Sequence, residues 1–401
     1  MSVSITFSKR RNVLRVSKRT KDYQESVIRE MTRLAIEHEA INLSQGFPDF
    51  DPPQEVLQAA SAAINGGHNQ YSPTWGILDL RVKLAEQYSD KLGWSVDAER
   101  HVTVTCGVTE AINVAMLAIL DPGDEIIIIE PAHENFVPSA LLSGAHPVAV
   151  PLTEQNFRLD VDLLKQALTD RTRALMLNTP HNPSGRVFDA DELLTITDFV
   201  VNNNLVLITD EIYDRILYDG RTHVCPGSIE ALRERTVTLG GMSKTFAITG
   251  WRLGYIIASS KLMAAMRPIH DYLTICAPTP LQMAAVTALS LPQEYYDGML
   301  IDYHNRRDKM MSILHTTGFE AQTPEGAYYV LADYSNVPSK HSQKDSKSFA
   351  IWMTAELRVA VVPGEVFYTT PSYGEKSVRF AFPKQLSTLQ AAADRMEAYF
   401  L

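Results

Sequence analysis

A single lysine, Lys244, lies in an unusual setting within the segment GGMSKTFAITGWRLGY (Gly240–Tyr255). It follows an apolar run, has small residues around it and precedes Arg252 by eight positions. Most lysines are solvated surface groups, so a lysine just past a buried strand is uncommon. A desolvated amine beside another cation loses its proton readily, and the neutral amine can form a Schiff base with a carbonyl group. Taken alone, Lys244 reads either as a solvated surface lysine or as the amine of a Schiff base, and its setting is suited to the second role.

Two more polar residues follow apolar runs in the same way. Asn182 lies in LNTPHNPSG (Leu177–Gly185), where two prolines and a glycine shape a rigid loop. Asp210 begins the tetrapeptide DEIY, directly after LVLIT. Taken singly, the loop reads equally well as a connecting turn and Asp210 as a helix cap. A carboxylate at a strand end can also keep a ring nitrogen protonated, which makes a pyridine an electron sink.

A third feature is suited to an anion. The segment TCGVTEA places Gly107, Val108 and Thr109 between an apolar run and a helical pattern. Small residues there let the backbone approach a phosphate, and amide groups at a helix N-terminus attract negative charge.

The elements that must position these groups are short β-branched runs, each followed by turn residues and a helical pattern. They are apolar on both faces, which is typical of strands covered by helices on both sides. The expected strands are His101–Thr105, Asp124–Glu130, Ala174–Asn178, Leu205–Asp210, Thr236–Leu239 and Gly254–Ala258. This pattern predicts a doubly wound, mainly parallel α/β sheet over about residues 60–290, with ligands at the carboxyl ends of its strands.

After about residue 300 the order changes, which predicts a second, smaller α+β domain. A polar helix (Tyr303–Leu314) precedes strands at Ala327–Ala332, Val359–Val362 and Val378–Phe382. We expect three regions: residues 1–55 as an N-terminal arm and part of the small domain, 56–300 as the large domain, and 301–401 as the C-terminal small domain.

Composition narrows the function classes. The 401 residues include 47 acidic and 37 basic ones, for a net charge of −10, so no global basic field favours nucleic acid. The three cysteines show no CxxC pairing, which argues against a disulfide framework or a zinc site and favours a reducing, cytoplasmic setting. No apolar run approaches a membrane span. Residues 1–21 carry seven basic and no acidic residues; we favour an arm that packs on another surface over a targeting peptide.

Together, SKTFAITGWRLGY, NTPHNPSG and DEIY, in a consistent order, resemble the class I/II aminotransferases, enzymes of fold type I that depend on pyridoxal 5′-phosphate (PLP). The resemblance covers about residues 40–385. It implies a large domain with a seven-stranded, mainly parallel doubly wound sheet and a smaller α+β domain.

The resemblance assigns roles to the residues found above. Lys244 would form the Schiff base with PLP and carry the proton, with Asp210 and Tyr213 completing the catalytic set. Asp210 would pair with the ring nitrogen, while Asn182 and Tyr213 would bond the phenolic oxygen. The remaining cofactor contacts would come from Gly107, Val108, Thr109, Arg252, His133 stacked on the ring, and Tyr71.

For the substrate, Arg379 in SVRFAFP resembles the family's carboxylate-binding arginine. Gly46 in LSQGFPDFDPP resembles the loop whose amide touches the same carboxylate, and Asn182 would contribute there too. The stretch LSQGFPDFDPP is most similar to the kynurenine, glutamine and aromatic aminotransferase branch. Tyr71, in YSPTWGILDLR, resembles the residue that reaches the other subunit's phosphate, which implies a homodimer; its alternative is a core tyrosine before a helix.

Two positions depart from the family pattern. Gly241 replaces a serine that many relatives use on the phosphate, which implies one fewer contact. His133, in EPAHENF, replaces the aromatic residue that usually stacks on the ring; it could stack or turn away, with Phe136 filling the space.

We therefore expect a ping-pong aminotransferase acting on an L-amino acid, with aromatic or other uncharged side chains favoured, and a 2-oxo acid. Elimination from cysteine conjugates, or formation of a cyclopropane amino acid, is the alternative on the same fold. A PLP-sensing transcription regulator is a remote alternative, because the resemblance begins by about Leu43 and leaves little room for a DNA-binding domain. No metal is expected.

Overall fold

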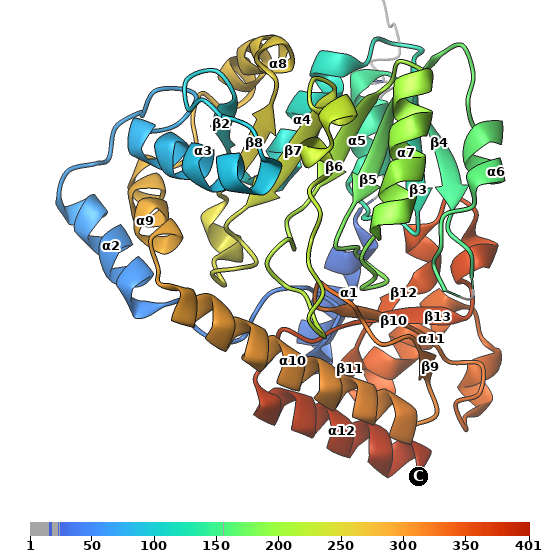
Figure 1. Ribbon diagram of the computed structural model, residues 1–401. Coiled ribbons are helices and arrows are strands. Elements are labelled where there is room, and N and C mark those ends of the chain that lie inside the picture. The colour runs from blue at the N-terminus through green and yellow to red at the C-terminus, as the bar shows by residue number, and fades with distance from the viewer. Residues whose placement is uncertain (1–15, 18–22, 24, 155) are drawn as a thin grey trace, which may run out of the picture.

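The computed structural model describes residues 16, 17, 23, 25–154 and 156–401. Most of the basic N-terminal stretch considered above lies outside these residues. The described chain forms a large sheet with helices on both faces, and below it a smaller layer of short strands and helices (Figure 1).

The large sheet has seven strands in the order β2-β8-β7-β6-β5-β3-β4. β8 runs antiparallel to both neighbours, and the other pairings in the sheet are parallel. This confirms the predicted doubly wound, mainly parallel sheet. The strands are β2 (Val102–Thr105), β3 (Glu125–Glu130), β4 (His146–Pro151), β5 (Thr172–Asn178), β6 (Val206–Asp210), β7 (Thr236–Gly241) and β8 (Gly254–Ala258).

Helices cover both faces because successive strand residues point to opposite sides. In β3, Ile126 and Ile128 pack into one core cluster, whereas Ile127 and Ile129 pack into another. The helices of this part are α2 (Gln54–Asn65), α3 (Leu78–Leu92), α4 (Gly107–Ile119), α5 (Phe136–Ser143), α6 (Val161–Gln166), α7 (Ala190–Asn202), α8 (Ser260–Leu273) and α9 (Thr279–Leu289).

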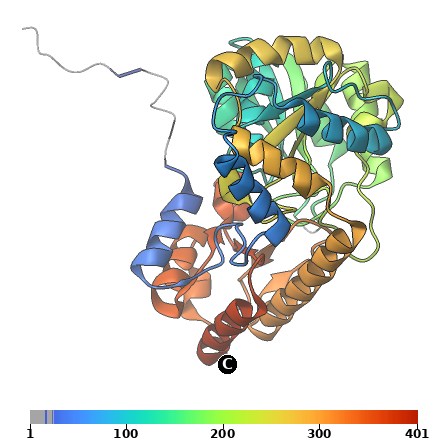
Figure 2. The same ribbon diagram turned by 90° about the vertical axis from the view of Figure 1, so that its left-hand side faces the viewer.

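The smaller layer is built from residues 25–42 and residues 293–401, which lie side by side in Figures 1 and 2. β1 (Ile41–Asn42) pairs in parallel with β11 (Val359–Ala360). A four-stranded antiparallel sheet has the order β12-β13-β10-β9. The other elements are α1 (Val27–Glu37), α10 (Gln293–Thr316), β9 (Glu320–Ala321), β10 (Tyr329–Asp333), α11 (Ser346–Trp352), β12 (Val362–Pro363), β13 (Ser377–Ala381) and α12 (Leu386–Phe400).

One strand was missed, and two local expectations were wrong. β4 was not predicted, because its sequence HPVAVP contains two prolines and lies half exposed at the sheet edge. The single expected strand Val359–Val362 is two strands, β11 and β12, in different sheets. The polar helix begins at Gln293 rather than Tyr303. None of the described helices combines the length and apolarity that a membrane span requires.

Candidate active site

The predicted site residues follow the carboxyl ends of the parallel strands, which meet at one edge of the sheet. Gly107 follows β2, His133 follows β3, and Asn182 follows β5. Asp210 is the last residue of β6, and Lys244 lies three positions after β7. Residues distant in sequence are thereby brought to the same edge.

Most of them line one cavity. Its predicted lining residues are Val108, Thr109, His133, Asn182, Asp210, Tyr213, Lys244 and Arg252. The other residues that line it are Ile112, Asn135, Asn178, Ile212, Ser243 and Thr249. Three further predicted residues do not line the cavity but contact residues that do: Gly107 contacts Arg252, Gly46 contacts Lys244, and Arg379 contacts Asn182.

Lys244 points into the site from the turn after β7. Its Nζ donates to the Gly46 carbonyl at 3.2 Å and lies 5.8 Å and 5.6 Å from the ring centres of Tyr213 and Tyr328. Burial lowers the pKa of Lys244, although Tyr329 and Asp210 oppose the shift. A larger fraction of the amine is therefore unprotonated and nucleophilic near neutral pH.

Asp210 is a buried carboxyl group, 6% exposed. Burial raises its pKa to about 7, against the opposing effects of the Ile212 N–H and the Lys244 charge. The Ile212 amide donates to its Oδ1 at 3.2 Å, and Asn178 Nδ2 donates to its backbone carbonyl at 2.8 Å. The carboxyl group thus keeps bonding capacity for a positively charged partner in the cavity.

Gly107 and Arg252 form the floor of an anion cradle at the N-terminus of α4. Gly107 has φ +75°, and a Cβ there would lie 2.5 Å from an Arg252 guanidinium nitrogen. Gly254 is equally restricted, since its Cβ would lie 2.5 Å from the Gly107 carbonyl carbon. The close approach of backbone, guanidinium and helix N-terminus suits a phosphate group.

Gly241, the departure from the family pattern, has little free space. A Cβ there would lie 3.1 Å from Val108 Cγ2 and 3.3 Å from Ile212 Cδ1. Val108 and Ile212 therefore leave little room for the serine side chain that many relatives carry at this position.

Arg379 is buried, 1% exposed, on the central part of β13. Its Nη1 donates to Asn182 Oδ1 at 2.9 Å and its Nη2 to the Ser44 carbonyl at 2.6 Å. Arg379 Nε and Asn182 Nδ2 are both buried without a hydrogen-bond partner. Unpaired buried donors are costly, so these two nitrogens favour the binding of an acceptor group in this part of the site.

His133 lines the cavity as a neutral imidazole. Burial, together with the charges of Arg379 and Lys244, lowers its pKa to about 3. Phe136, the other aromatic residue of this segment, is 2% exposed and packs in the hydrophobic core. The side chain available to face a ring in this cavity is therefore His133.

Tyr71 is far more exposed than a core residue, at 78%. Its reading as a core tyrosine before a helix is thus wrong, and within one chain it does not line the cavity.

Tyr329 was not singled out in the sequence. It is 3% exposed, accepts a hydrogen bond from the Tyr213 hydroxyl at 3.1 Å, and has the Arg379 guanidinium 4.3 Å from its ring centre. A Cβ at Gly46 would lie 1.8 Å from its hydroxyl oxygen, so Gly46 is required for this packing. Only the apolar context of AYYVLA hinted that Tyr329 would be buried.

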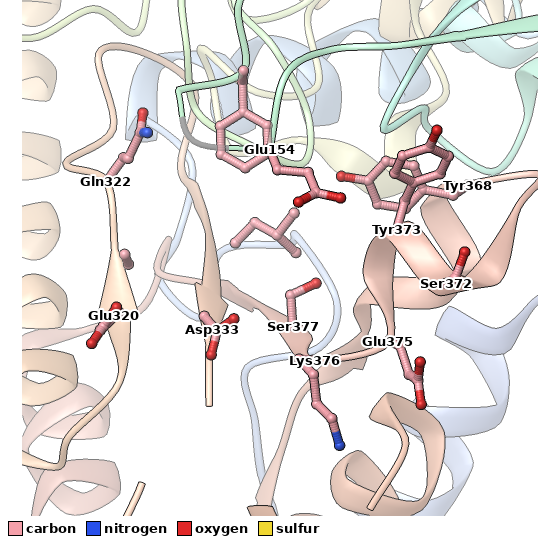
Figure 3. A pocket seen from close by; sticks show the side chains of 13 residues that line it. Glu154, Glu320, Gln322, Asp333, Tyr368, Ser372, Tyr373, Glu375, Lys376 and Ser377 are labelled. Atoms are coloured by element: carbon pink, nitrogen blue, oxygen red, sulfur yellow. The ribbon is translucent and has the colours of Figure 1, made fainter. Parts of the chain in front are cut away.

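A larger cavity of about 590 Å³ lies elsewhere, between the small sheet and the loop after β4 (Figure 3). Its charged lining residues are Glu154, Glu320, Asp333, Glu375 and Lys376. The Lys376 amine already donates to backbone carbonyls at residues 342–344. This cavity therefore offers no free amine for carbonyl chemistry.

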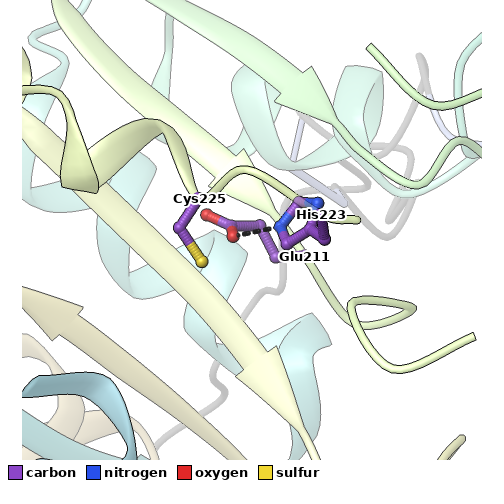
Figure 4. A group of neighbouring side chains, drawn as sticks. All are labelled: Glu211, His223 and Cys225. Carbon is purple, nitrogen blue, oxygen red and sulfur yellow. Dashed lines mark hydrogen bonds and ion pairs between the residues drawn. The ribbon is translucent and has the colours of Figure 1, made fainter. Parts of the chain in front are cut away.

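Glu211, His223 and Cys225 form a second polar cluster (Figure 4), with potential ligand atoms within 4.8 Å of one another. The Glu211 carboxylate already accepts from Thr209 Oγ1 and lies 2.6 Å from His223 Nε2. The Glu211 carboxylate is therefore already bonded within the protein, to Thr209 and His223.

The chain matches the family model described as aminotransferase class I and II over residues 38–396. It is 37% identical to a probable N-succinyldiaminopimelate aminotransferase of Mycobacterium tuberculosis, covering 94% of this chain and 97% of that one. It is 36% identical to the methionine aminotransferase of Escherichia coli (92% and 95% covered) and 33% identical to human kynurenine–oxoglutarate transaminase 1 (92% and 94%).

The solved structures agree. The Mycobacterium tuberculosis N-succinyldiaminopimelate aminotransferase superimposes with a TM-score of 0.92 at 36% identity, covering 96% of this chain and all of that one. The methionine aminotransferase of Escherichia coli gives a TM-score of 0.91 at 34% identity, with 96% and 100% covered. The chain therefore belongs to the class I and II aminotransferase family of PLP-dependent transferases, and it is an aminotransferase with the fold-type I architecture.

Proposed function

We propose that this aminotransferase binds PLP in the cavity at the carboxyl edge of the large sheet, with Lys244 as its covalent anchor. The observation that carries the proposal is the convergence of three residues on one cavity: Asp210 from the end of β6, and Lys244 and Arg252 from the connection between β7 and β8. The donor set fits the cofactor: an amine of lowered pKa, a buried carboxyl group and a guanidinium beside a helix N-terminus.

When bound, PLP supplies an aldehyde that condenses with amines and a ring that accepts the electron pair released at the substrate Cα. Asp210 would keep the ring nitrogen protonated. Asn182 and Tyr213 would bond the phenolic oxygen, and His133 would lie against the ring. Gly107, Val108, Thr109 and Arg252 would hold the phosphate.

The protein's part in the reaction is binding and proton transfer. Arg379 and Asn182, with the Gly46 segment, would orient the substrate carboxylate, since their unpaired nitrogens need an acceptor. Lys244 Nζ would be the base that takes the proton from the substrate Cα and the acid that gives it back. The catalytic residues are thus Lys244, Asp210 and Tyr213.

We further propose an L-amino acid with an aromatic or other uncharged side chain as donor and a 2-oxo acid as acceptor, in a ping-pong cycle. Among the described residues that line the cavity, Lys244 and Arg252 are the only lysine and arginine, and both have assigned tasks. A side-chain carboxylate would find no further cation there. The relatives named for methionine and kynurenine support this choice, whereas the one named for N-succinyldiaminopimelate favours an acidic side chain.

We also propose a homodimer in which Tyr71 reaches the phosphate of the other subunit. Its 78% exposure on a single chain supports this role. The proposed domains are residues 1–55 with the arm and part of the small domain, 56–300 as the large domain, and 301–401 as the small domain. The parallel pairing of β1 with β11 supports the first assignment for the described residues.

The direct test is a half-reaction. The PLP-loaded protein is mixed with single amino acids in the absence of a 2-oxo acid, and the visible band of lysine-bound PLP is followed. We expect methionine, phenylalanine, tyrosine or kynurenine to replace that band with the ultraviolet band of pyridoxamine phosphate, and a 2-oxo acid to restore it. A persistent visible band, with pyruvate release from a cysteine conjugate, would instead assign a β-lyase.

A further inference from the structure

A buried ion pair lies directly behind the anion cradle. Glu110, in the first turn of α4, and His270, near the end of α8, are 160 residues apart in sequence. His270 Nδ1 lies 2.7 Å from Glu110 Oε1, and the His270 side chain is fully buried. None of the roles proposed above uses either residue.

The hydrogen bonds fix the charge of His270. Its Nδ1 faces the Glu110 carboxylate, and its Nε2 lies 2.7 Å from the Thr74 carbonyl. Both partners are acceptors, so both ring nitrogens carry a proton and the ring is an imidazolium. Burial alone would lower its pKa, but the hydrogen bond and charge of Glu110 outweigh burial and raise it.

The Glu110 carboxylate is bonded on every side. It accepts from the backbone N–H of Cys106, the residue before Gly107, and from the Thr274 hydroxyl. The first bond holds the turn that leads into the cradle. Through Thr274 and His270 the same carboxylate ties that turn to the end of α8, and through Thr74 to the loop that follows Tyr71.

The position of Glu110 creates an electrostatic difficulty for a phosphate site. A carboxylate in the first helical turn stabilises the helix, but it repels a dianion placed at the same N-terminus. An imidazolium 2.7 Å away cancels most of that repulsion. The turn can thus be fixed by a carboxylate while the cradle remains attractive to an anion.

We propose that Glu110 and His270 are a positioning pair for the phosphate of the cofactor: Glu110 fixes the turn at Cys106–Gly107, and His270 neutralises Glu110. This rests on the proposed PLP site. Neither residue touches the reacting atoms, and both act through the cradle formed by Gly107 and Arg252.

The test compares PLP with pyridoxal, which has the same aldehyde and ring but no phosphate. Both are titrated into the apoprotein, and the visible band gives the two dissociation constants. In His270→Gln the uncompensated carboxylate should weaken PLP binding by roughly tenfold or more and leave pyridoxal binding almost unchanged. Glu110→Gln/His270→Gln removes the charge as well and should recover most of the preference for PLP.

The Glu211–His223 pair provides a matched control, because it is another buried carboxylate–imidazole contact at 2.6 Å in the same domain. We expect His223→Gln to leave the ratio of the two constants at the wild-type value. A purely structural role for His270 would change both ligands equally, or neither, and an unchanged ratio in His270→Gln overturns the proposal.

If His270→Gln does not fold, Glu110→Gln provides the second measurement. It removes the repelling charge and retains an amide oxygen that can accept from the Cys106 N–H, so its PLP to pyridoxal preference should equal or exceed that of the wild type. A lower preference contradicts the proposal. If the wild-type apoprotein forms no visible band with either ligand, the proposed PLP site itself is wrong, which distinguishes the two failures.

Discussion

At the residue scale, burial of the Asp210 carboxyl group lowers the free energy of unfolding near neutral pH. The Asp210 carboxyl group has a pKa of about 7 in the folded protein, against 3.8 when exposed to solvent, so it ionises less readily in the folded protein than in the unfolded chain. Such a group favours the folded state most at low pH, and this contribution is lost as the pH rises from about 4 to 7.

Asp210→Asn should therefore stabilise the apoprotein at pH 8 while abolishing most of its transaminase activity. The pKa difference of about three units corresponds to at most about 4 kcal/mol in the free energy of unfolding. Urea unfolding of both apoproteins at pH 8 and pH 4.5 measures it, and the gain should shrink at the lower pH. A variant less stable than wild type at pH 8 would show that Asp210 is not an unfavourably buried carboxylate.

At the scale of elements, the turn from β2 into α4 decides whether the cradle forms. Gly107 needs both a positive φ and room for the Arg252 guanidinium. Gly93, which ends α3, has a similar φ of +69°, but nothing lies within 4 Å of its would-be Cβ. A substitution at Gly93 therefore tests backbone strain alone, whereas one at Gly107 tests backbone strain together with steric contact with Arg252.

Gly107→Ala and Gly93→Ala should each lose about 1 kcal/mol of stability through the left-handed backbone. Only Gly107→Ala should also displace Arg252 and weaken PLP binding by roughly tenfold or more. Thermal unfolding and PLP titration measure the two effects. Equal PLP affinities in the two variants would contradict the placement of the phosphate at Gly107.

The elements also show what the sequence could predict. The central strands were recognisable because burial on both faces leaves continuous apolar runs, as in EIIIIE of β3. The edge strand β4 lacks that signal, and β11 and β12 are too short to reveal that they belong to different sheets. Short strands of this kind are defined by tertiary pairing rather than by local pattern.

The same distinction holds for the site. Lys244, Asp210 and Asn182, which line one cavity, could be selected from the sequence because each sits in a characteristic segment at or after the end of a strand. Tyr329 and His270 were not, since their partners lie 116 and 160 residues away and no local motif marks them. A resemblance transfers residues within motifs, but it does not reveal contacts formed only by the folded chain.

At the scale of the whole molecule, the proposed dimer brings the exposed Tyr71 to a second site. Purified protein should have a mass in solution of twice the 44.7 kDa of one chain. Tyr71→Phe should keep that mass and weaken PLP binding by about tenfold, since one hydrogen bond to a charged group is lost. Light scattering and PLP titration measure both quantities. A monomeric, fully active wild-type protein would contradict the role of Tyr71.

The central claim is that Lys244 is the covalent anchor of PLP, and one measurement tests it most directly. The PLP-loaded protein is reduced with borohydride, digested, and analysed by peptide mass spectrometry. We predict a single pyridoxyl group, on the peptide that contains Lys244, and no labelled peptide in Lys244→Ala. A pyridoxyl group on another lysine of the wild-type protein, or none at all, would contradict the account.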